Sequence, residues 1–192
     1  MTDTAATLPK TATVKAAVVR TAGTNCDAET VYALERAGAA VDMVHLHSLM
    51  RAPEKLADYR IVVFPGGFTY GDDIASGVVF AVEMRERVLP ELRRRLADGA
   101  LVLGICNGFQ ILVRAGLLPD TDGRSNAAGL GQEASLQTNV SGRFECRWVR
   151  LEATTDRSVF LEKGQVRFEG SAQELSERDD LARAVFLGKE GG

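Results

Sequence analysis

Histidine is scarce in this 192-residue sequence, which contains only His45 and His47. Long apolar runs are missing, since no stretch approaches the roughly 18 residues that a membrane-spanning helix needs. Residues 1–15 lack the apolar segment of a secretory signal. Three cysteines without regular spacing do not fit a disulfide scaffold and are typical of reduced cytoplasmic thiols. A net charge of -3 is too small to indicate binding to nucleic acid or to a membrane. These absences favour a cytoplasmic globular protein.

What is present fits one domain. Apolar residues make up 45% of the chain and charged residues 26%, which is usual for a globular protein. We expect residues 1–14 to form a flexible leader and residues 15–192 to form a single domain. Beyond about residue 164 the pattern of apolar residues fades, so that part is expected to be atypical or truncated.

Short apolar runs alternate with segments of helical periodicity. Strands are predicted over residues 15–20, 40–46, 59–65 and 101–105, and helices over 24–38, 78–100 with a break at Pro90, and 107–115. This alternation predicts an α/β fold with a mostly parallel sheet, whose sites form at the carboxyl ends of the strands. Two later strands, over 134–140 and 143–153 and joined at Ser141-Gly142, predict an antiparallel C-terminal extension.

A cysteine stands where the fourth predicted strand turns into a helix. Gly104 and Gly108 flank Cys106 at the Gly-x-Cys-x-Gly spacing of a nucleophile elbow, with Cys in the place of Ser. Small neighbours permit the strained turn, and the helix N-terminus favours negative charge on the sulfur. The alternative is a buried structural cysteine, because free cysteines are often buried. We predict that Cys106 is a nucleophile, whereas Cys26 is interpreted as structural or peripheral and Cys146 as a core residue on the apolar face of its strand.

A glycine pair, Gly66-Gly67, directly follows the third predicted strand. Glycines leave backbone N–H groups open to an anion, although the pair alone could be only a tight turn. Beside the elbow it predicts an oxyanion hole formed by the N–H groups of Gly67 and Asn107.

The elbow and the glycine pair together resemble the class I (triad) glutamine amidotransferases. The segments GTNCD, VVFPGGFTYGDD, LGICNGFQIL and NVSGRFECRWV stand in the order typical of those members that serve a separate synthetase. The resemblance covers about residues 15–160. It implies a flavodoxin-like, mostly parallel sheet flanked by helices, with a C-terminal antiparallel extension.

The resemblance also implies a reaction and its participants. Cys106 would attack the side-chain amide of glutamine, form a thioester and release ammonia to a larger synthetase subunit, with a small third subunit left open. No Walker-type loop is present, so ATP and magnesium would belong to the partner, and this chain would hold no cofactor or metal. The residues that would hold glutamine are Gln110, Asn139, Ser141, Gly142 and Arg143.

The base that such a cysteine needs is hard to find. His45 and His47 lie two residues apart at the end of the second predicted strand. We interpret them as ordinary strand-end histidines rather than as the catalytic base. In the family, the catalytic histidine and its glutamate come late, but no histidine follows His47 here. Three explanations stay open: a truncated or internally deleted chain, a base from another polypeptide, or a degenerate relative. Alternative functions are a catalytically impaired scaffold subunit and a cysteine-elbow hydrolase of the same superfamily.

Overall fold

The computed structural model describes residues 13–119, 132–143, 145, 148 and 150. The strands are β1 (Lys15–Arg20), β2 (Ala40–His45), β3 (Ile61–Phe64) and β4 (Leu101–Gly104). The α-helices are α1 (Asp27–Arg36), α2 (Leu46–Arg51), α3 (Val78–Arg85), α4 (Val88–Ala97) and α5 (Asn107–Arg114). Two 3₁₀ helices complete the set, η1 (Pro53–Asp58) and η2 (Thr69–Asp72).

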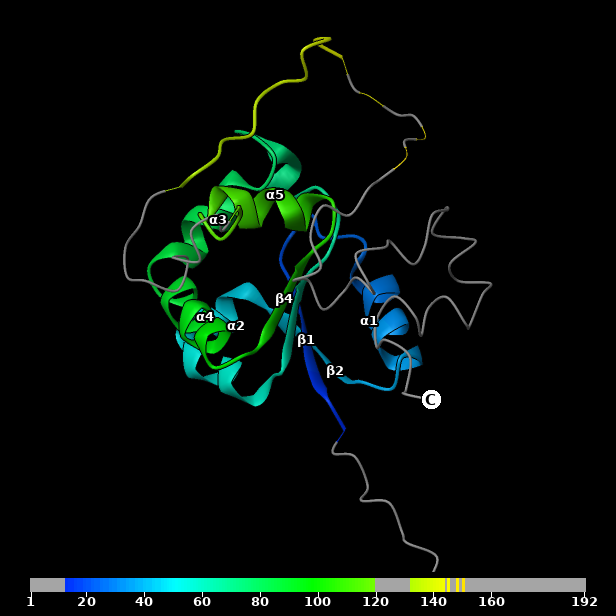
Figure 1. Cartoon of the computed structure of the whole chain (residues 1–192), viewed down its shortest axis with the longest axis vertical. Coiled ribbons are helices and arrows are strands. Elements are labelled where there is room, and N and C mark those ends of the chain that lie inside the picture. The colour runs from blue at the N-terminus through cyan, green and yellow to red at the C-terminus, as the bar shows by residue number, and fades with distance from the viewer. Residues whose placement is uncertain (1–12, 120–131, 144, 146–147, 149, 151–192) are drawn as a thin grey trace, which may run out of the picture.

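The four strands form one parallel sheet in the order β2-β1-β3-β4. Helices flank both faces: α1 covers one, and α2, α3, α4 and α5 cover the other (Figure 1). Because all the strands run in the same direction, their carboxyl ends share one edge of the sheet. The predicted α/β class with a parallel, flavodoxin-like sheet is confirmed.

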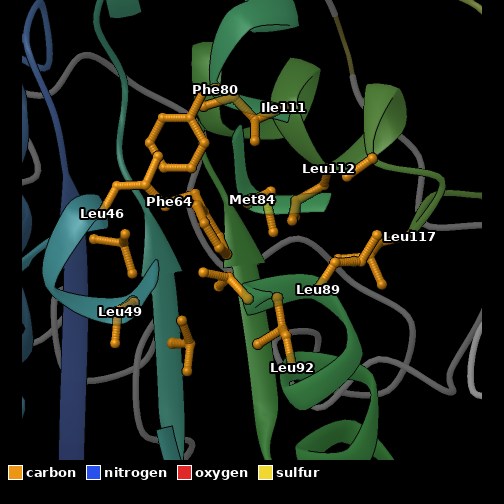
Figure 2. Close-up of a cluster of buried hydrophobic side chains, with 14 of the residues drawn as sticks. Leu46, Leu49, Phe64, Phe80, Met84, Leu89, Leu92, Ile111, Leu112 and Leu117 are labelled. Atoms are coloured by element: carbon orange, nitrogen blue, oxygen red, sulfur yellow. The ribbon is translucent and has the colours of Figure 1, made fainter. Parts of the chain in front are cut away.

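The sheet is apolar on both faces because helices cover both. Side chains of β1 alternate between two clusters: Ala17 and Val19 face the four-helix side, whereas Ala16 and Val18 face α1. In the larger cluster, the rings of Phe64 and Phe80 pack edge to face with their centroids 5.7 Å apart. Figure 2 shows this cluster, in which side chains from α2, α3, α4 and α5 converge on β3. The packing fixes α5, and so the residue before it, against the sheet.

The predicted helix over 78–100 is two helices. α3 ends at Arg85 and α4 begins at Val88, so the break lies just before Pro90. Pro90 is the third residue of α4, in the first turn, where its missing N–H has no intrahelical partner to lose. Among the described residues, no helix combines the length and the apolar character needed to cross a membrane.

The predicted helix over residues 24–38 begins later than expected, because α1 starts at Asp27. Cys26 is the residue before α1, and it makes no side-chain capping bond. The Thr24 hydroxyl oxygen instead accepts a hydrogen bond from the backbone N–H of Thr21, at 3.1 Å. The predicted end of the helix is confirmed, because Gly38 adopts a φ of 90° just beyond it.

The predicted strand over residues 134–140 does not form, since these residues have no regular secondary structure. A strand needs a hydrogen-bonded neighbour, and apolar alternation alone does not supply one. The second predicted strand, over 143–153, lies largely outside the described residues.

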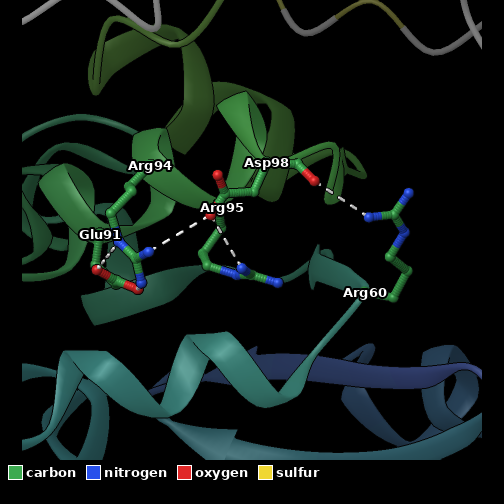
Figure 3. Close-up of polar contacts among 5 residues, drawn as sticks. All are labelled: Arg60, Glu91, Arg94, Arg95 and Asp98. Carbon is green, nitrogen blue, oxygen red and sulfur yellow. Dashed lines mark hydrogen bonds and ion pairs between the residues drawn. The ribbon is translucent and has the colours of Figure 1, made fainter.

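The charged face of α4 carries local ion pairs, as its interleaved acids and bases predict (Figure 3). Arg94 donates to Glu91 at 2.9 Å, and Arg95 lies 3.2 Å from Asp98. Arg60, which precedes β3, donates to the backbone carbonyl of Asp98 at 3.3 Å. Such surface pairs contribute little to stability.

A tyrosine next to the sheet gives a pH-dependent prediction. Burial, together with the hydrogen bond that Tyr59 donates to Asp42 at 3.0 Å, raises the pKa of Tyr59 to about 12. The unfolded chain would titrate this group near pH 10. The stabilisation is therefore present below pH 10 and is lost as the pH rises towards 12. We expect the free energy of unfolding, measured with urea, to fall more steeply over this range in the wild type than in Tyr59→Phe. Equal slopes would contradict the assignment.

Candidate functional site

Three loops meet at the carboxyl edge of the sheet, following β1, β3 and β4. The chain leaves β1 for β2 on one side, whereas β3 lies on the other side of β1. This reversal of strand order is the switch point at which parallel α/β sheets form their sites. The loops that follow these strands carry Cys26, Gly66-Gly67 and Cys106.

Cys106 occupies the elbow between β4 and α5. Its backbone has φ 53° and ψ -111°, a left-handed conformation that non-glycine residues rarely adopt. The side chain is exposed, and the residue directly precedes α5. The structure therefore supports the predicted strained elbow and not the buried-cysteine alternative.

The two flanking glycines permit β4, α5 and β3 to approach closely. A Cβ atom on Gly108 would lie 1.8 Å from the backbone oxygen of Phe64. A Cβ atom on Gly104 would lie 2.6 Å from Cδ1 of Leu112 and 2.8 Å from the backbone of Gly108. No side chain fits at either position, which explains the Gly-x-Cys-x-Gly spacing physically.

The predicted glycine turn lies beside the cysteine. A Cβ atom on Gly66 would be 3.5 Å from Cβ of Cys106. Gly67 adopts a φ of 146°, and the backbone N–H of the next residue, Phe68, donates to the carbonyl of Gly23 at 2.9 Å. Among the described residues, the N–H groups of Gly67 and Asn107 donate no hydrogen bond, as oxyanion donors require. The oxyanion hole itself stays a prediction.

The side chain of Asn107 joins the elbow to the glycine loop, a role that the sequence reasoning missed. Its Oδ1 accepts hydrogen bonds from the hydroxyl of Thr69 at 2.7 Å and from the N–H of Thr69 at 3.3 Å. Its Nδ2 donates to Asp72 at 3.3 Å and to Gln110 at 3.1 Å. The residue is 1% exposed. A buried amide with all its hydrogen bonds satisfied holds these loops in one arrangement.

The loop beyond the glycine pair is strained. Tyr70 and Asp72 have φ values of 55° and 54°, outside the range usual for side-chain-bearing residues. The Asp72 carboxylate also accepts a hydrogen bond from Ser76 at 2.9 Å, and the Tyr70 hydroxyl donates to Glu83. We call the four hydrogen bonds of the Asn107 side chain the Asn107 clamp. Together with this clamp, the bonds of Asp72 and Tyr70 maintain the strained backbone next to Cys106.

The two histidines belong to a different part of the sheet. His45 ends β2 and accepts a hydrogen bond from the N–H of His47 at 3.2 Å. His47 lies in α2, so the expectation that both lie on one strand is wrong, and its Nε2 is 3.6 Å from Glu83. Three inter-strand spacings separate β2 from β4, about 14 Å. The end of β2, where His45 lies, is therefore far from Cys106. Among the described residues, His47 contacts His45 and Glu83 and makes no contact with Cys106.

The residues predicted to hold glutamine are only partly brought together. Gln110 is half-buried one turn after Cys106 and accepts the hydrogen bond from Asn107. Asn139, Ser141, Gly142 and Arg143 form an exposed turn whose hydrogen bonds join its own members. Figure 1 shows their segment, in yellow, extending away from the helices. Glutamine binding by these five residues stays a prediction.

Comparison with protein families provides the decisive observation. Residues 13–171 match the family described as the CobB/CobQ-like glutamine amidotransferase domain. The chain belongs to this family. Cys106, on its elbow, and the adjacent glycine turn both lie within the matched range, so the glutamine amidotransferase match includes the site described above.

Curated relatives of this family member are named phosphoribosylformylglycinamidine synthase subunit PurQ. The Dehalococcoides mccartyi protein is 48% identical over 138 residues, which cover 72% of this chain and 52% of the relative. The Methanococcus maripaludis C5 protein is 43% identical over 141 residues, which cover 72% of this chain and 50% of that relative. The Pyrococcus furiosus protein is 40% identical over 156 residues, which cover 80% of this chain and 60% of that relative. The aligned part of this chain therefore spans about half the length of the first two relatives and somewhat more of the third.

A solved structure shows the same similarity in three dimensions. The structure of PurLQS from Thermotoga maritima matches with a TM-score of 0.60 at 35% identity. The match covers 80% of this chain and 63% of that chain. The fold of this chain therefore agrees with the family assignment made from its sequence.

Proposed function

We propose that this chain acts as the glutaminase subunit of a phosphoribosylformylglycinamidine synthase in purine biosynthesis. It would release ammonia from glutamine for a larger synthetase subunit, which would use ATP and magnesium to convert formylglycinamide ribonucleotide to its amidine. A small third subunit is part of the same expectation. The observation that carries the proposal is an exposed cysteine on a strained elbow beside a glycine turn, in a chain whose relatives bear that name.

The geometry supports acyl transfer by a thiol. The Cys106 sulfur would attack the carboxamide carbon of glutamine, and the oxyanion that forms would accept hydrogen bonds from the N–H groups of Gly67 and Asn107. Collapse of this intermediate breaks the carbon–nitrogen bond and releases ammonia, which needs one proton. Water then hydrolyses the γ-glutamyl thioester to glutamate and regenerates the thiol.

Large apolar side chains surround the proposed reaction centre and favour a covering partner. Phe68 and Ile74, in the loop after β3, are 64% and 75% exposed. Ile105 and Phe109, on either side of Cys106, are also exposed. Exposed apolar groups gathered on the segments around one site are typical of a surface that another protein covers. We therefore expect the synthetase subunit to dock over this edge of the sheet.

The proposal also predicts limited turnover by this chain. A positioned acid–base group contributes about 10²- to 10⁴-fold to such a reaction, and among the described residues neither histidine contacts Cys106. We expect Cys106 to form a covalent adduct with a glutamine-like electrophile while glutamine hydrolysis stays near background. Hydrolysis at the rate of an intact glutaminase, undiminished in a His45→Ala/His47→Ala double variant, would show that another base operates. Background hydrolysis that rises when the synthetase is added would place that base in the partner.

Labelling of Cys106 tests the nucleophile directly. A diazoketone analogue of glutamine is expected to add one equivalent to the wild-type chain, located at Cys106 by peptide mass mapping. Cys106→Ser should lose the adduct by at least about 100-fold, because a hydroxyl without a base is a poor nucleophile. Cys146→Ser serves as the matched control and should label as the wild type does. Labelling that is unaffected by Cys106→Ser, or that excess glutamine does not slow, would contradict the proposal.

Reconstitution separates the enzyme from its alternatives. With the synthetase subunit, ATP and magnesium, any amidine formation from glutamine is expected to depend on Cys106, so Cys106→Ser should support the reaction only from added ammonium. Equal activity of the two variants with glutamine would favour a scaffold role. Ester or amide hydrolysis by the isolated chain, independent of glutamine, would instead favour a cysteine-elbow hydrolase.

A further inference from the structure

A second thiol lies close to the nucleophile. Cys26 directly precedes α1, as Cys106 directly precedes α5, so both cysteines stand at helix N-termini on the same edge of the sheet. Both are free and exposed, and an oxidant in solution can therefore reach them. Cys26 was expected to be structural or peripheral, but the fold brings it to the site.

The two cysteine side chains lie on the same side of Gly66. A Cβ atom built on Gly66 would be 3.4 Å from Sγ of Cys26 and 3.5 Å from Cβ of Cys106. The N–H of Cys26 donates to the carbonyl of Gly66 at 3.2 Å, which holds the first cysteine against the glycine turn. Because Gly66 has no side chain, no larger group occupies the point that both cysteines approach.

The electrostatic environment agrees with this proximity. Partial burial raises the pKa of the Cys26 thiol, and the negative charges of Glu29, Cys106 and Asp27 raise it further. A charge on the Cys106 sulfur is thus felt at Cys26.

We propose that Cys26 is a resolving cysteine, which forms a reversible disulfide with Cys106 when a peroxide oxidises the nucleophile. The Cβ atoms of Cys26 and Cys106 lie 3.6 Å and 3.5 Å from the same point beside Gly66, so they are separated by at most the sum of these distances, about 7 Å. A disulfide needs Cβ atoms about 3.5–4.5 Å apart, so the two loops would have to close on each other by a few ångströms at most. The inference concerns the oxidation state of the thiols and goes beyond the proposed glutaminase function, on which it does not depend.

The chemistry balances with hydrogen peroxide as the oxidant. The Cys106 thiolate attacks one peroxide oxygen, the oxygen–oxygen bond breaks, and the departing hydroxide takes a proton to become water. The resulting sulfenic acid is then attacked by the Cys26 sulfur, which loses its proton, and a second water leaves as the sulfur–sulfur bond forms. Two thiols are oxidised, one peroxide is reduced, and a dithiol reductant reverses the change. The disulfide blocks the nucleophile but protects it from irreversible oxidation.

The test uses the full chain in a Cys146→Ser background, so that two thiols remain. After treatment with hydrogen peroxide, the intact mass is expected to fall by two hydrogen atoms, and non-reducing peptide mapping should find Cys26 joined to Cys106. Dithiothreitol should restore both the mass and the reactivity of Cys106 towards a maleimide. These readouts need no glutamine, so their failure is distinct from failure of the proposed function.

The matched variant adds Cys26→Ser in the same background. Its Cys106 should react with maleimide before oxidation as the parent does, which shows that the elbow is folded. After peroxide it is expected to gain oxygen atoms, and dithiothreitol should recover less than about a tenth of its thiol once sulfinic acid has formed. Equal recovery in the two proteins, or a disulfide that joins two chains instead of two residues of one chain, would overturn the proposal.

Discussion

Gly108→Ala is expected to be among the most damaging single substitutions in this chain. The added methyl carbon would lie 1.8 Å from the backbone oxygen of Phe64 and 2.5 Å from its carbonyl carbon. Backbone atoms of a central strand cannot turn aside as a side chain can, so α5 must move away from β3. Overpacking in a well-packed core costs 1–3 kcal/mol, and a clash of this depth is expected to exceed about 3 kcal/mol.

The measurement is urea unfolding followed by circular dichroism. The midpoint should fall with little change in the m-value, and covalent labelling of Cys106 by the glutamine analogue should slow, since the elbow moves with α5. Gly116→Ala is the control at the other end of the same helix, because its nearest contact would be 3.6 Å away. That variant adds only the strain of a φ of 72°, about 1 kcal/mol. Similar losses in the two variants would contradict the close approach of α5 and β3.

Asn107→Leu is the second substitution for which we expect a large effect. Leucine has a similar volume but makes none of the four hydrogen bonds of the buried amide. The N–H and hydroxyl of Thr69 would lose their buried acceptor, and each such orphaned group costs about 1–3 kcal/mol. We expect a loss of about 2–4 kcal/mol in the free energy of unfolding. Labelling of Cys106 should also fall, because the clamp between the elbow and the glycine loop is lost.

A double-mutant cycle with Thr69→Val separates the clamp from general destabilisation. Thr69→Val removes only the hydroxyl that donates to Asn107 at 2.7 Å and keeps the backbone bond. If the side chains act as one unit, the losses of the single variants should add to more than the loss of the double variant, by at least about 0.5 kcal/mol. Strict additivity, or unchanged labelling in Asn107→Leu, would show that the loop is held by other contacts.

The sequence predicted most of the fold because the two central strands, β1 and β3, are buried on both faces. Continuous apolar runs such as Ile61–Phe64 stand out against their polar neighbours, and alternation with helical periodicity implies parallel pairing. Prediction from the sequence failed where the local residue pattern does not determine the secondary structure. The 134–140 segment has the residues of a strand but forms none in the structure, and a strand requires a partner that residue pattern cannot specify.

The candidate site was predictable to the extent that it depends on neighbours in sequence. Gly104, Cys106 and Gly108 indicate an elbow because a strained turn between a strand and a helix tolerates only small flanking residues. The clamp of Asn107 was not predictable. Its partners Thr69 and Asp72 are 38 and 35 residues away, and an asparagine at this position carries no local sign that its amide is buried.

By itself, the sequence determined the parallel α/β architecture and the nucleophile elbow, because apolar periodicity and glycine spacing act over a few residues. Only the tertiary structure decided which distant groups meet there. The strand order β2-β1-β3-β4 places His45, at the end of β2, at the far edge from Cys106, and the fold brings Cys26 and the glycine turn close to the nucleophile. The physical reason is that strand order depends on packing between segments distant in the chain, which no local pattern encodes.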